Sequence, residues 1–289
     1  MKILLLGKNG QLGHEILKQG NFYHNISLKG YDRDELDVLD FIKVKKTVES
    51  QKPDVIINTT AYHVVLDCEK HPEKAFASNA FAVLNLARTC NEYGICLVTY
   101  STDYVFDGSK GGAYEEDDVP NPLQIYGLSK FIGEKICLNY HPNSLVIRTC
   151  GVYGGKKGSR SKKGNFVLQI LAESDKLKEI EVAKEQIISP TYAGDLARAT
   201  FQLINGKASP GIYHLVNEGY CSWAEFAQKI VKLAKKKCKI IPVDRGCRSG
   251  EMKKPRLSAL KNTKAGKMNI ILSHWSNGLK KYLNSLKGE

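Results

Sequence analysis

The N-terminal region of this 289-residue chain has no apolar run long enough for a secretion signal or a membrane span. Its longest apolar stretch is Ile3–Leu6. With 42% hydrophobic and 25% charged residues, the composition is that of a soluble globular protein and not of a disordered chain. We therefore expect a cytoplasmic protein without a membrane partner.

No pair of cysteines has the C-x-x-C spacing. In a chain of this size, scattered cysteines predict reduced thiols that pack in the interior, with neither a disulfide framework nor a metal site. The eight cysteines are Cys68, Cys90, Cys96, Cys137, Cys150, Cys221, Cys238 and Cys247.

Acidic residues are too few to balance the basic ones, since 43 Lys and Arg face 30 Asp and Glu and the net charge is +13. Nucleic acid is the first partner to consider for such a charge. However, the lysines are spread along the chain, with small clusters at 156–163 and 235–239, and no helix-turn-helix, zinc-finger or aromatic RNA-binding signature accompanies them. We expect a lysine-rich solvated surface that binds no nucleic acid, part of which could steer an anionic substrate.

Segments typical of strands and helices alternate from the first residues onward. Short apolar strands that alternate with helices are typical of a parallel sheet covered on both faces, and right-handed crossovers make such a sheet doubly wound. The predicted fold class is therefore α/β, with a Rossmann doubly wound parallel sheet. We predict strands at Lys2–Leu6, Ile26–Tyr31, Val55–Asn58, Cys96–Ser101 and Leu145–Thr149, and helices at Leu12–Lys18, Phe41–Ser50, Glu73–Glu92 and Leu123–Asn139.

The alternation weakens after Gly151, which indicates a second, smaller region. A loop is predicted over 154–164, which holds four glycines and five basic residues. We expect a dinucleotide-binding Rossmann domain over 1–155 plus about 190–217, and an interleaved C-terminal substrate-binding region over 156–189 plus 218–289. Further elements are predicted at Phe166–Ala172, Ile180–Ala183, Asp195–Ile204, Ile212–Val216, Trp223–Ala234 and Leu279–Leu286, with a lysine-rich turn before the last helix.

A glycine-rich turn lies between the first predicted strand and the first predicted helix, with the sequence Gly7-Lys8-Asn9-Gly10-Gln11-Leu12-Gly13. Glycines here let the backbone pass close to a pyrophosphate, and the helix N-terminus supplies N–H donors and the positive end of the helix dipole. The spacing alone would also fit an ordinary turn from strand to helix. Its place in an alternating chain predicts a dinucleotide site.

Asp32 and Arg33 end the second predicted strand, about twenty residues beyond the glycines, where an acidic residue usually meets the adenosine ribose. Asp32 favours NAD, whereas Arg33 is able to hold the extra phosphate of NADP. We expect NADPH as the cofactor, with NADH as the alternative. Asp40 is the best placed acid for the adenine edge, although a helix N-cap explains it equally well.

The segment Tyr126-Gly127-Leu128-Ser129-Lys130 places a phenol and an ammonium four residues apart, and so on one face of a helix. A nearby cation lowers the pKa of a tyrosine, which suits it to exchange a proton near neutral pH. Upstream, the segment Ser101-Thr102-Asp103-Tyr104 closes the fourth predicted strand, where a hydroxyl would lie at the carboxyl edge of the sheet beside the cofactor. Such a hydroxyl, together with Tyr126 and Lys130, would polarise a carbonyl while a nicotinamide delivers hydride, whereas Tyr-x-x-x-Lys alone is common as a surface pair.

These motifs resemble those of the extended short-chain dehydrogenase/reductases and, within them, the dTDP-4-dehydrorhamnose reductase family. The resemblance runs over essentially the whole chain, and the string around Thr102 is its most specific part. It rests on Gly7–Gly13, Asn58-Thr-Thr-Ala-Tyr62, Asn79-Ala80, Tyr100-Ser-Thr-Asp-Tyr-Val-Phe106, Pro122–Lys130, Arg148-Thr149, Gly164-Asn165-Phe166, Ser189-Pro-Thr-Tyr192, Asp195-Leu196 and Trp275.

The resemblance implies reduction of the 4-keto group of a nucleotide-activated 6-deoxy sugar, with dTDP-4-dehydro-L-rhamnose as the favoured substrate. Tyr126 is implied as the proton donor, Thr102 as the residue that hydrogen-bonds the same oxygen, and Lys130 as the residue that holds the nicotinamide ribose. Cofactor contacts are implied for Gly7, Asn9, Gly10, Gln11, Leu12, Gly13, Asp32, Arg33, Asp40, Ala61, Tyr62, Asn79, Tyr100 and Lys130. Substrate contacts are implied for Asp103, Tyr104, Asn165, Phe166 and Lys254, of which Lys254 lacks the bidentate fork of the arginine in many relatives.

Two places depart from the pattern of that family. Gly151 stands where many rhamnose reductases have a tryptophan, so a platform facing the sugar is missing and the identity of the sugar is open. The stretch 62–69 has Leu66-Asp67 where aspartate then lysine is commoner, and His63 within it would approach the substrate or serve the structure. Some relatives depend on magnesium at dimer contacts; no carboxylate cluster predicts a metal site here, and a homodimer is left open.

Three alternatives stay open beside the reductase. A 4-epimerase or dehydratase would need a carboxylic acid beside the strand-four hydroxyl, a place that Asp103 occupies, although the surrounding string is that of the reductase. A regulatory subunit of methionine adenosyltransferase would bind a dinucleotide and a partner enzyme, against which the complete set of Thr102, Tyr126 and Lys130 argues. Nucleic-acid binding rests on charge alone.

Overall fold

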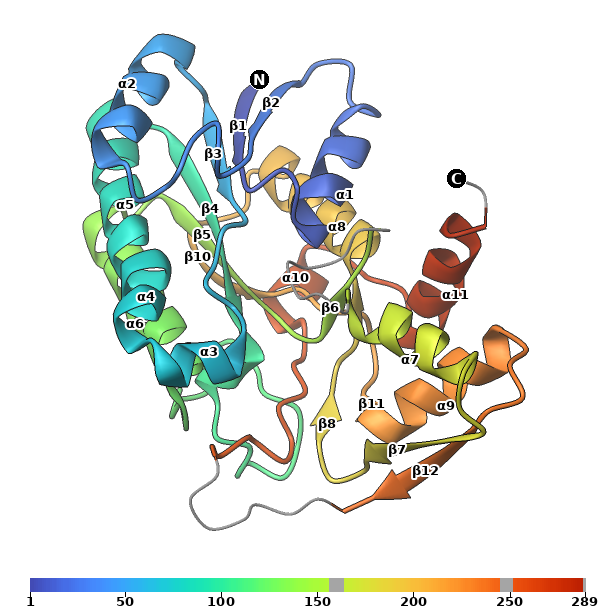
Figure 1. Cartoon of the computed structure of the whole chain (residues 1–289). Coiled ribbons are helices and arrows are strands. Elements are labelled where there is room, and N and C mark those ends of the chain that lie inside the picture. Colours follow the sequence, from blue (N-terminus) through green and yellow to red (C-terminus); the bar gives the residue numbers. More distant parts are fainter. Residues whose placement is uncertain (156–163, 245–251, 288–289) are drawn as a thin grey trace.

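Six strands form the central sheet, in the order β2-β1-β3-β4-β5-β10 (Figure 1). The structure is a computed structural model that describes residues 1–155, 164–244 and 252–287. Every neighbouring pair of strands in this sheet is parallel. The strands are β1 (Lys2–Leu6), β2 (Ser27–Tyr31), β3 (Val55–Asn58), β4 (Cys96–Thr102), β5 (Ser144–Thr149) and β10 (Gly211–His214).

The strand order reverses at β1, because β2 pairs with one edge of β1 and β3 with the other. In open α/β sheets, ligands bind beyond the carboxyl ends of the strands at such a reversal. All residues of β3 and β5 are buried, as expected for strands covered on both faces. The predicted fold class, a doubly wound parallel sheet, is confirmed.

Helices cover both faces of the sheet (Figure 1). Successive residues of a strand point to opposite faces, so Leu5 and Ile57 pack against one helix layer while Leu4 and Ile56 pack against the other. The first layer contains α1 (Gln11–Gly20) and α8 (Ala193–Asn205), which contact each other, with α10 (Thr263–Lys267) beside β10. The second contains α2 (Phe41–Gln51), α5 (Ala82–Tyr93) and α6 (Ile125–Tyr140).

The long helix predicted over Glu73–Glu92 is present, but a π-helical turn interrupts it. It runs as α4 (Pro72–Phe76), the π turn η1 (Ala77–Phe81) and then α5. A short helix that the sequence pattern does not predict, α3 (Val65–Lys70), precedes it. A π turn inside an α-helix shifts the faces of the residues that follow and is frequent near functional sites.

A second region packs beyond the carboxyl end of the sheet. Its core is rich in aromatic residues, among them Tyr153, Tyr192, Phe226 and Tyr282. It contains the helices α7 (Phe166–Ser174), α9 (Trp223–Leu233) and α11 (Trp275–Ser285), and the paired strands β7 (Glu179–Ala183) with β12 (Lys239–Val243), β8 (Ile187–Ile188) with β11 (Cys221–Ser222), and β6 (Val152–Tyr153) with β9 (Thr191–Tyr192).

In the second region, the sequence pattern does not predict strand β12, and one helix boundary needs correction. Strand β12 begins at Lys239, the last residue of the lysine cluster at 235–239, and gains hydrogen bonds from β7, about sixty residues earlier in the chain. Helix α11 begins at Trp275, four residues before the predicted start at Leu279. Most of the loop predicted over 154–164, the lysine cluster at 156–163 and Cys247 lie outside the described residues.

Across the described ranges, none of the helices combines the length and the apolar character that crossing a membrane requires. The seven cysteines in these ranges carry free thiols, and six of them are buried, in agreement with the packing role predicted for them.

Candidate active site

The glycine-rich turn lies at the carboxyl end of β1, where the strand order reverses. Gly7 has a φ of +89°, and a Cβ on Gly13 would stand 2.2 Å from the carbonyl oxygen of Gly7. Glycine is therefore required at both positions for α1 to start so close behind the strand. Gly10 precedes α1 and has no side chain with which to cap it, so an anion is a favoured partner for the first N–H groups of the helix.

Asp32 lies beside the glycine-rich turn, as predicted. Asn9 donates a hydrogen bond to Asp32 over 2.9 Å, and Lys8 lies 2.5 Å from Glu35 and 3.8 Å from Asp32. The backbone N–H of Glu35, with a smaller contribution from the charge of Lys8, lowers the pKa of Asp32, so this carboxylate is ionised at neutral pH. Lys8 is a basic residue at this site that the motif analysis did not single out.

Arg33 and Asp40 extend from the same edge of the sheet. The guanidinium of Arg33 is 58% exposed and donates to Asp37 over 2.9 Å, so it is accessible to a phosphate near Asp32. Asp40 caps α2, because its Oδ1 accepts a hydrogen bond from the backbone N–H of Lys43. The helix N-cap interpretation of Asp40 is therefore confirmed, and its contact with adenine stays a prediction.

Thr102 and Tyr126 come from different elements and meet at the end of the sheet. Thr102 is the last residue of β4, is buried, and leads into the 3-10 turn η2 (Asp103–Val105). Tyr126 stands in the first turn of α6, and its phenol is hydrogen-bonded to Thr102. The predicted hydroxyl–phenol pair is thus assembled in the structure.

Close packing of the start of α6 brings these two residues together. A Cβ on Gly127 would stand 2.0 Å from the carbonyl oxygen of Tyr104, so only glycine lets the helix approach η2 this closely. The first turn is capped by the side chain of Gln124, which accepts from the N–H of Gly127 over 2.6 Å. Glu69 of α3 also accepts from the N–H of Ile125 over 2.7 Å, which ties the unpredicted helix α3 to the site.

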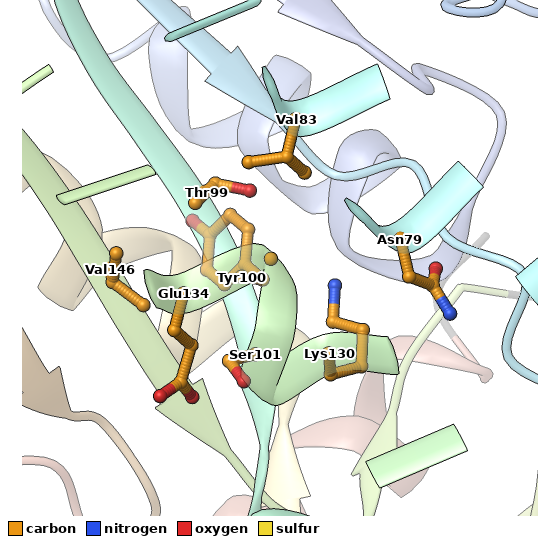
Figure 2. A pocket seen from close by; sticks show the side chains of 9 residues that line it. Asn79, Val83, Thr99, Tyr100, Ser101, Lys130, Glu134 and Val146 are labelled. Carbon is orange, nitrogen blue, oxygen red and sulfur yellow. The ribbon is translucent and has the colours of Figure 1, made fainter. Parts of the chain in front are cut away.

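Lys130 lies one turn after Tyr126 on α6 and is 5% exposed. In Figure 2 its amine points into a pocket between Asn79 and Tyr100, while the carboxylate of Glu134, one turn further on, points away. Burial lowers the pKa of Lys130 to about 8, although the charge of Glu134 acts in the opposite direction. Lys130 is thus a buried cation beside the proposed nicotinamide site.

The prediction that Lys130 lowers the pKa of Tyr126 is wrong for this structure. Burial raises the pKa of the Tyr126 phenol, and the hydrogen bond from Thr102 offsets only part of that rise. Desolvation disfavours the phenolate and is the largest influence on this phenol. Tyr126 therefore carries its proton at neutral pH.

A pocket of about 230 Å³ opens in front of these residues, between the sheet and the second region. One side is polar, formed by Thr102, Asp103, Tyr104 and Tyr126, and the other is apolar. The apolar side includes Ile188 and Trp223 from the second region, which sequence reasoning did not assign to the site. The remaining lining residues are His63, Val65, Cys150 and Gly151.

Gly151 follows β5 and lines this pocket with a φ of +53°. That left-handed conformation strains most side chains, and a Cβ would stand 3.1 Å from the side chain of Ile188. The backbone therefore favours glycine here, and the pocket wall at this point is formed by Ile188 and Trp223.

Several predicted contact residues also hold the structure together. Asn79 donates to the backbone oxygen of Tyr62 over 2.9 Å and to Ser129 over 3.0 Å, and so joins the loop after β3 to α6. The hydroxyl of Tyr100 pairs with Thr200 over 2.8 Å, on the side of the sheet covered by α8. Ala61 is exposed, Leu12 and Gln11 are half-buried, and the side chain of Gln11 accepts from the N–H of Gly154 over 3.0 Å.

The predicted substrate residues of the second region differ in position. Asn165 is buried, caps α7 and donates to the hydroxyl of Tyr282 over 2.9 Å, so its amide serves the packing of α11. Phe166 packs on Trp223 with a centroid separation of 4.5 Å and so supports the apolar wall. Lys254 is exposed and is not among the residues that line the pocket within the described ranges. Over the same ranges, no three His, Cys, Asp or Glu side chains converge as a metal site would require.

The sheet is doubly wound, and a glycine turn follows β1. Thr102 lies at the end of β4, and Tyr126 and Lys130 lie in the first two turns of α6. These features together define a Rossmann-fold dehydrogenase or reductase of the short-chain class. A family model described as the RmlD substrate binding domain matches residues 1–287, and the chain belongs to this family. The predicted resemblance is confirmed.

Individual relatives cover almost the whole chain. The spore coat polysaccharide biosynthesis protein SpsK of Bacillus subtilis is 34% identical over 98% of this chain and 96% of its own length. A dTDP-4-dehydrorhamnose reductase of Clostridium acetobutylicum is 33% identical and superposes with a TM-score of 0.92 over 99% of this chain and 100% of its own. A dTDP-4-dehydrorhamnose reductase of Bacillus anthracis, solved in complex with NADP, is 33% identical with a TM-score of 0.89 over 98% and 99%.

Proposed function

We propose that this protein reduces the 4-keto group of a nucleotide-activated 6-deoxy sugar with NADPH, and that its substrate is dTDP-4-dehydro-L-rhamnose. The observation that carries the proposal is the meeting of Thr102 and a protonated Tyr126 in one pocket, with Lys130 buried behind them. The similarity to dTDP-4-dehydrorhamnose reductases over nearly the full chain supports this substrate class.

NADPH binds along the carboxyl edge of β1, β2 and β3, within the domain formed by 1–155 and about 190–217. The glycine turn fits the cofactor, because Gly10, at the N-cap of α1, carries no side chain, and no side chain caps the first N–H groups of the helix, where a pyrophosphate would bind. Asp32 and Arg33 lie where the adenosine ribose and its phosphate bind, and Lys130 and Asn79 flank the nicotinamide end. When bound, NADPH supplies the hydride that reduces the ketone.

The chain's own residues orient the ketone and supply the proton. Tyr126 donates its proton to the oxygen at C4 of the sugar, and Thr102 donates a hydrogen bond to the same oxygen. Asp103 and Tyr104 contact the sugar, and Ile188 and Trp223 form an apolar wall that suits a deoxy carbon. Phe166 supports this wall by packing on Trp223. The nucleotide extends toward the region of 156–189 plus 218–289, where Asn165 and Lys254 lie.

The excess of basic residues, which gives a net charge of +13, suits two ligands that are both polyanions. A cytoplasmic location, a homodimer and the lack of a nucleic-acid partner stay predictions. Size-exclusion chromatography with light scattering measures the oligomeric state directly.

The activity is tested by incubating the purified chain with NADPH and dTDP-4-dehydro-L-rhamnose and identifying the product by mass spectrometry and NMR. The proposal predicts a product with two additional hydrogens, one of them on C4. A product that keeps its keto group would contradict it.

A further inference from the structure

Asp103 is a buried carboxyl group next to the catalytic hydroxyl, and it is 4% exposed. Its Oδ1 is 3.0 Å from Oγ1 of Thr102, and its Oδ2 accepts a hydrogen bond of 2.6 Å from Oγ of Ser258. Ser258 comes from the C-terminal part of the chain, 155 residues away, and is itself buried. Its backbone N–H donates to the oxygen of Ile187 over 3.0 Å, which fixes its place beside the pocket.

Thr102 has limited hydrogen-bonding capacity, with one proton to donate and two lone pairs to accept. One lone pair is already occupied, because the backbone N–H of Tyr104 donates to Oγ1 over 3.2 Å. One proton and one lone pair are therefore left to serve both Asp103 and the substrate side, where Tyr126 lies. How they are divided depends on whether Asp103 carries a proton.

If Asp103 is ionised, it has only lone pairs to offer, so Thr102 must give its single proton to the carboxylate. The last lone pair of Thr102 then faces the substrate side, and a ketone oxygen, which needs donors, would meet an acceptor. If Asp103 is protonated, its O–H donates a hydrogen bond to the last lone pair of Thr102. The proton of Thr102 then has one direction left, toward Tyr126 and the substrate.

We propose that Asp103 is a positioning residue that makes Thr102 a donor: the neutral carboxyl of Asp103 donates to Thr102, while Ser258 holds its other oxygen. This inference rests on the proposed function only for the identity of the oxygen that receives the Thr102 proton. The proton of Asp103 stays on the carboxyl through the reaction. The proton that ends on the product comes from Tyr126, so Asp103 directs a hydrogen bond and transfers nothing.

The surroundings of Asp103 support a neutral carboxyl. The titratable groups that face it are Cys150 at the end of β5, Tyr104 on η2 and Tyr126 on α6, while His63 lines the same pocket. The two tyrosines and the thiol are buried and uncharged at neutral pH. Burial is the largest influence and raises the pKa of Asp103, although its contacts with Ser258, Cys150 and Thr102 act in the opposite direction.

The protonation of Asp103 is measured directly by infrared difference spectroscopy of the full chain at neutral pH, with the D103N variant as the reference. We expect a carbonyl band of a protonated carboxyl group in the wild type that is missing from D103N. In S258A the band should move to higher frequency, because the carbonyl oxygen loses a hydrogen bond. A wild-type spectrum without this band, or a band unmoved in S258A, would overturn the inference.

The consequence for Thr102 is measured with two substitutions of similar size. The amide of D103N still donates to Thr102, whereas the side chain of D103L does not. We expect kcat of D103N within about tenfold of the wild type and kcat of D103L lower by about 10²–10³, the usual effect of losing one donor to a reacting oxygen. Equal losses in both variants, with NADPH binding and Tm retained in both, would overturn the proposal.

The two experiments separate this inference from the proposed function. A wild-type chain that reduces no 4-keto nucleotide sugar would remove the proposed function, while the infrared bands would still decide whether Asp103 is protonated and held by Ser258.

Discussion

Gly127 of α6 packs directly against the carbonyl oxygen of Tyr104, and a Cβ at position 127 would stand 2.0 Å from that oxygen. This contact brings the first turn of α6 to the end of β4. As a result the phenol of Tyr126 reaches Thr102, although the two residues belong to different elements. The geometry of the proton donor therefore depends on the lack of one methyl group.

The substitution G127A should separate Tyr126 from Thr102. The added methyl group meets a backbone atom, so α6 must shift, and we expect a loss of stability of about 1–3 kcal/mol, as for other overpacked sites. A shift of this kind near the reacting groups should lower kcat by about 10²-fold. Thermal melting and steady-state kinetics measure both effects.

The matched control for G127A is G266A on α10, because a Cβ at position 266 would have open space around it. Alanine in an exposed helix is favoured over glycine, so G266A should keep the activity and melt at the same or a higher temperature. Wild-type kcat in G127A would show that the close contact does not position Tyr126.

Replacing Tyr126 by phenylalanine should remove most of the turnover. Y126F deletes the proton donor and keeps the ring, so we expect kcat to fall by about 10²–10⁴, the usual contribution of a general acid. NADPH affinity, measured by fluorescence titration, should stay close to that of the wild type. Retained turnover would assign the proton to another group.

Lys130 should make the stability of the protein depend on alkaline pH in a defined direction. Burial lowers its pKa from 10.5 to about 8. Below pH 8 the lysine is charged in both the folded and the unfolded protein, and the desolvation of this charge destabilises the folded protein. Between pH 8 and 10.5 the folded state releases the proton first, and the free energy of unfolding rises with pH. The full change corresponds to roughly 3 kcal/mol.

Chemical denaturation of the wild type and K130M at pH 7 and pH 10 isolates this effect, because other titrating groups cancel in the difference. Without added cofactor, K130M should be the more stable protein at pH 7, and its advantage should shrink toward pH 10. K130M should have little activity at either pH. A constant difference between the two proteins would show that Lys130 does not titrate in this range.

Arg33 should determine part of the preference for NADPH over NADH. Its guanidinium is accessible beside Asp32, so R33A should lower the NADPH/NADH ratio of kcat/KM by about tenfold, the value of one hydrogen bond to a charged group. K46A removes an exposed charge from the nearby helix α2 and should leave the ratio unchanged. If R33A kept the wild-type ratio, Lys8 would be the next residue to test for the phosphate.

Much of the fold follows from local patterns in the sequence. The strands β1, β3, β4 and β5 are short apolar runs, and their limits differ from prediction by a residue at most. Strand β12 could not be predicted in the same way, because it depends on pairing with the distant β7. Helix α3 has only six residues, too few for a helical period to be recognised.

The site shows the same division between local and distant contacts. Thr102, Tyr126 and Lys130 belong to motifs with fixed spacing, and they can be found from the sequence. Ser258 lies beside Asp103 only because a distant segment folds back, so no local pattern marks it. The pKa of Tyr126 could not be inferred from the spacing to Lys130 either, since burial decides it.

We expect this protein to reduce a nucleotide-linked 4-keto sugar with hydride from NADPH. The most direct measurement follows the loss of NADPH absorbance when the purified chain is mixed with each of a panel of 4-keto nucleotide sugars, with Y126F in parallel. We expect rapid oxidation of NADPH with dTDP-4-dehydro-L-rhamnose, and little with Y126F. Binding of NADPH without oxidation by any member of the panel would contradict it and favour a regulatory dinucleotide-binding role, and conversion of a plain dTDP-hexose to a 4-keto-6-deoxy sugar would favour a dehydratase.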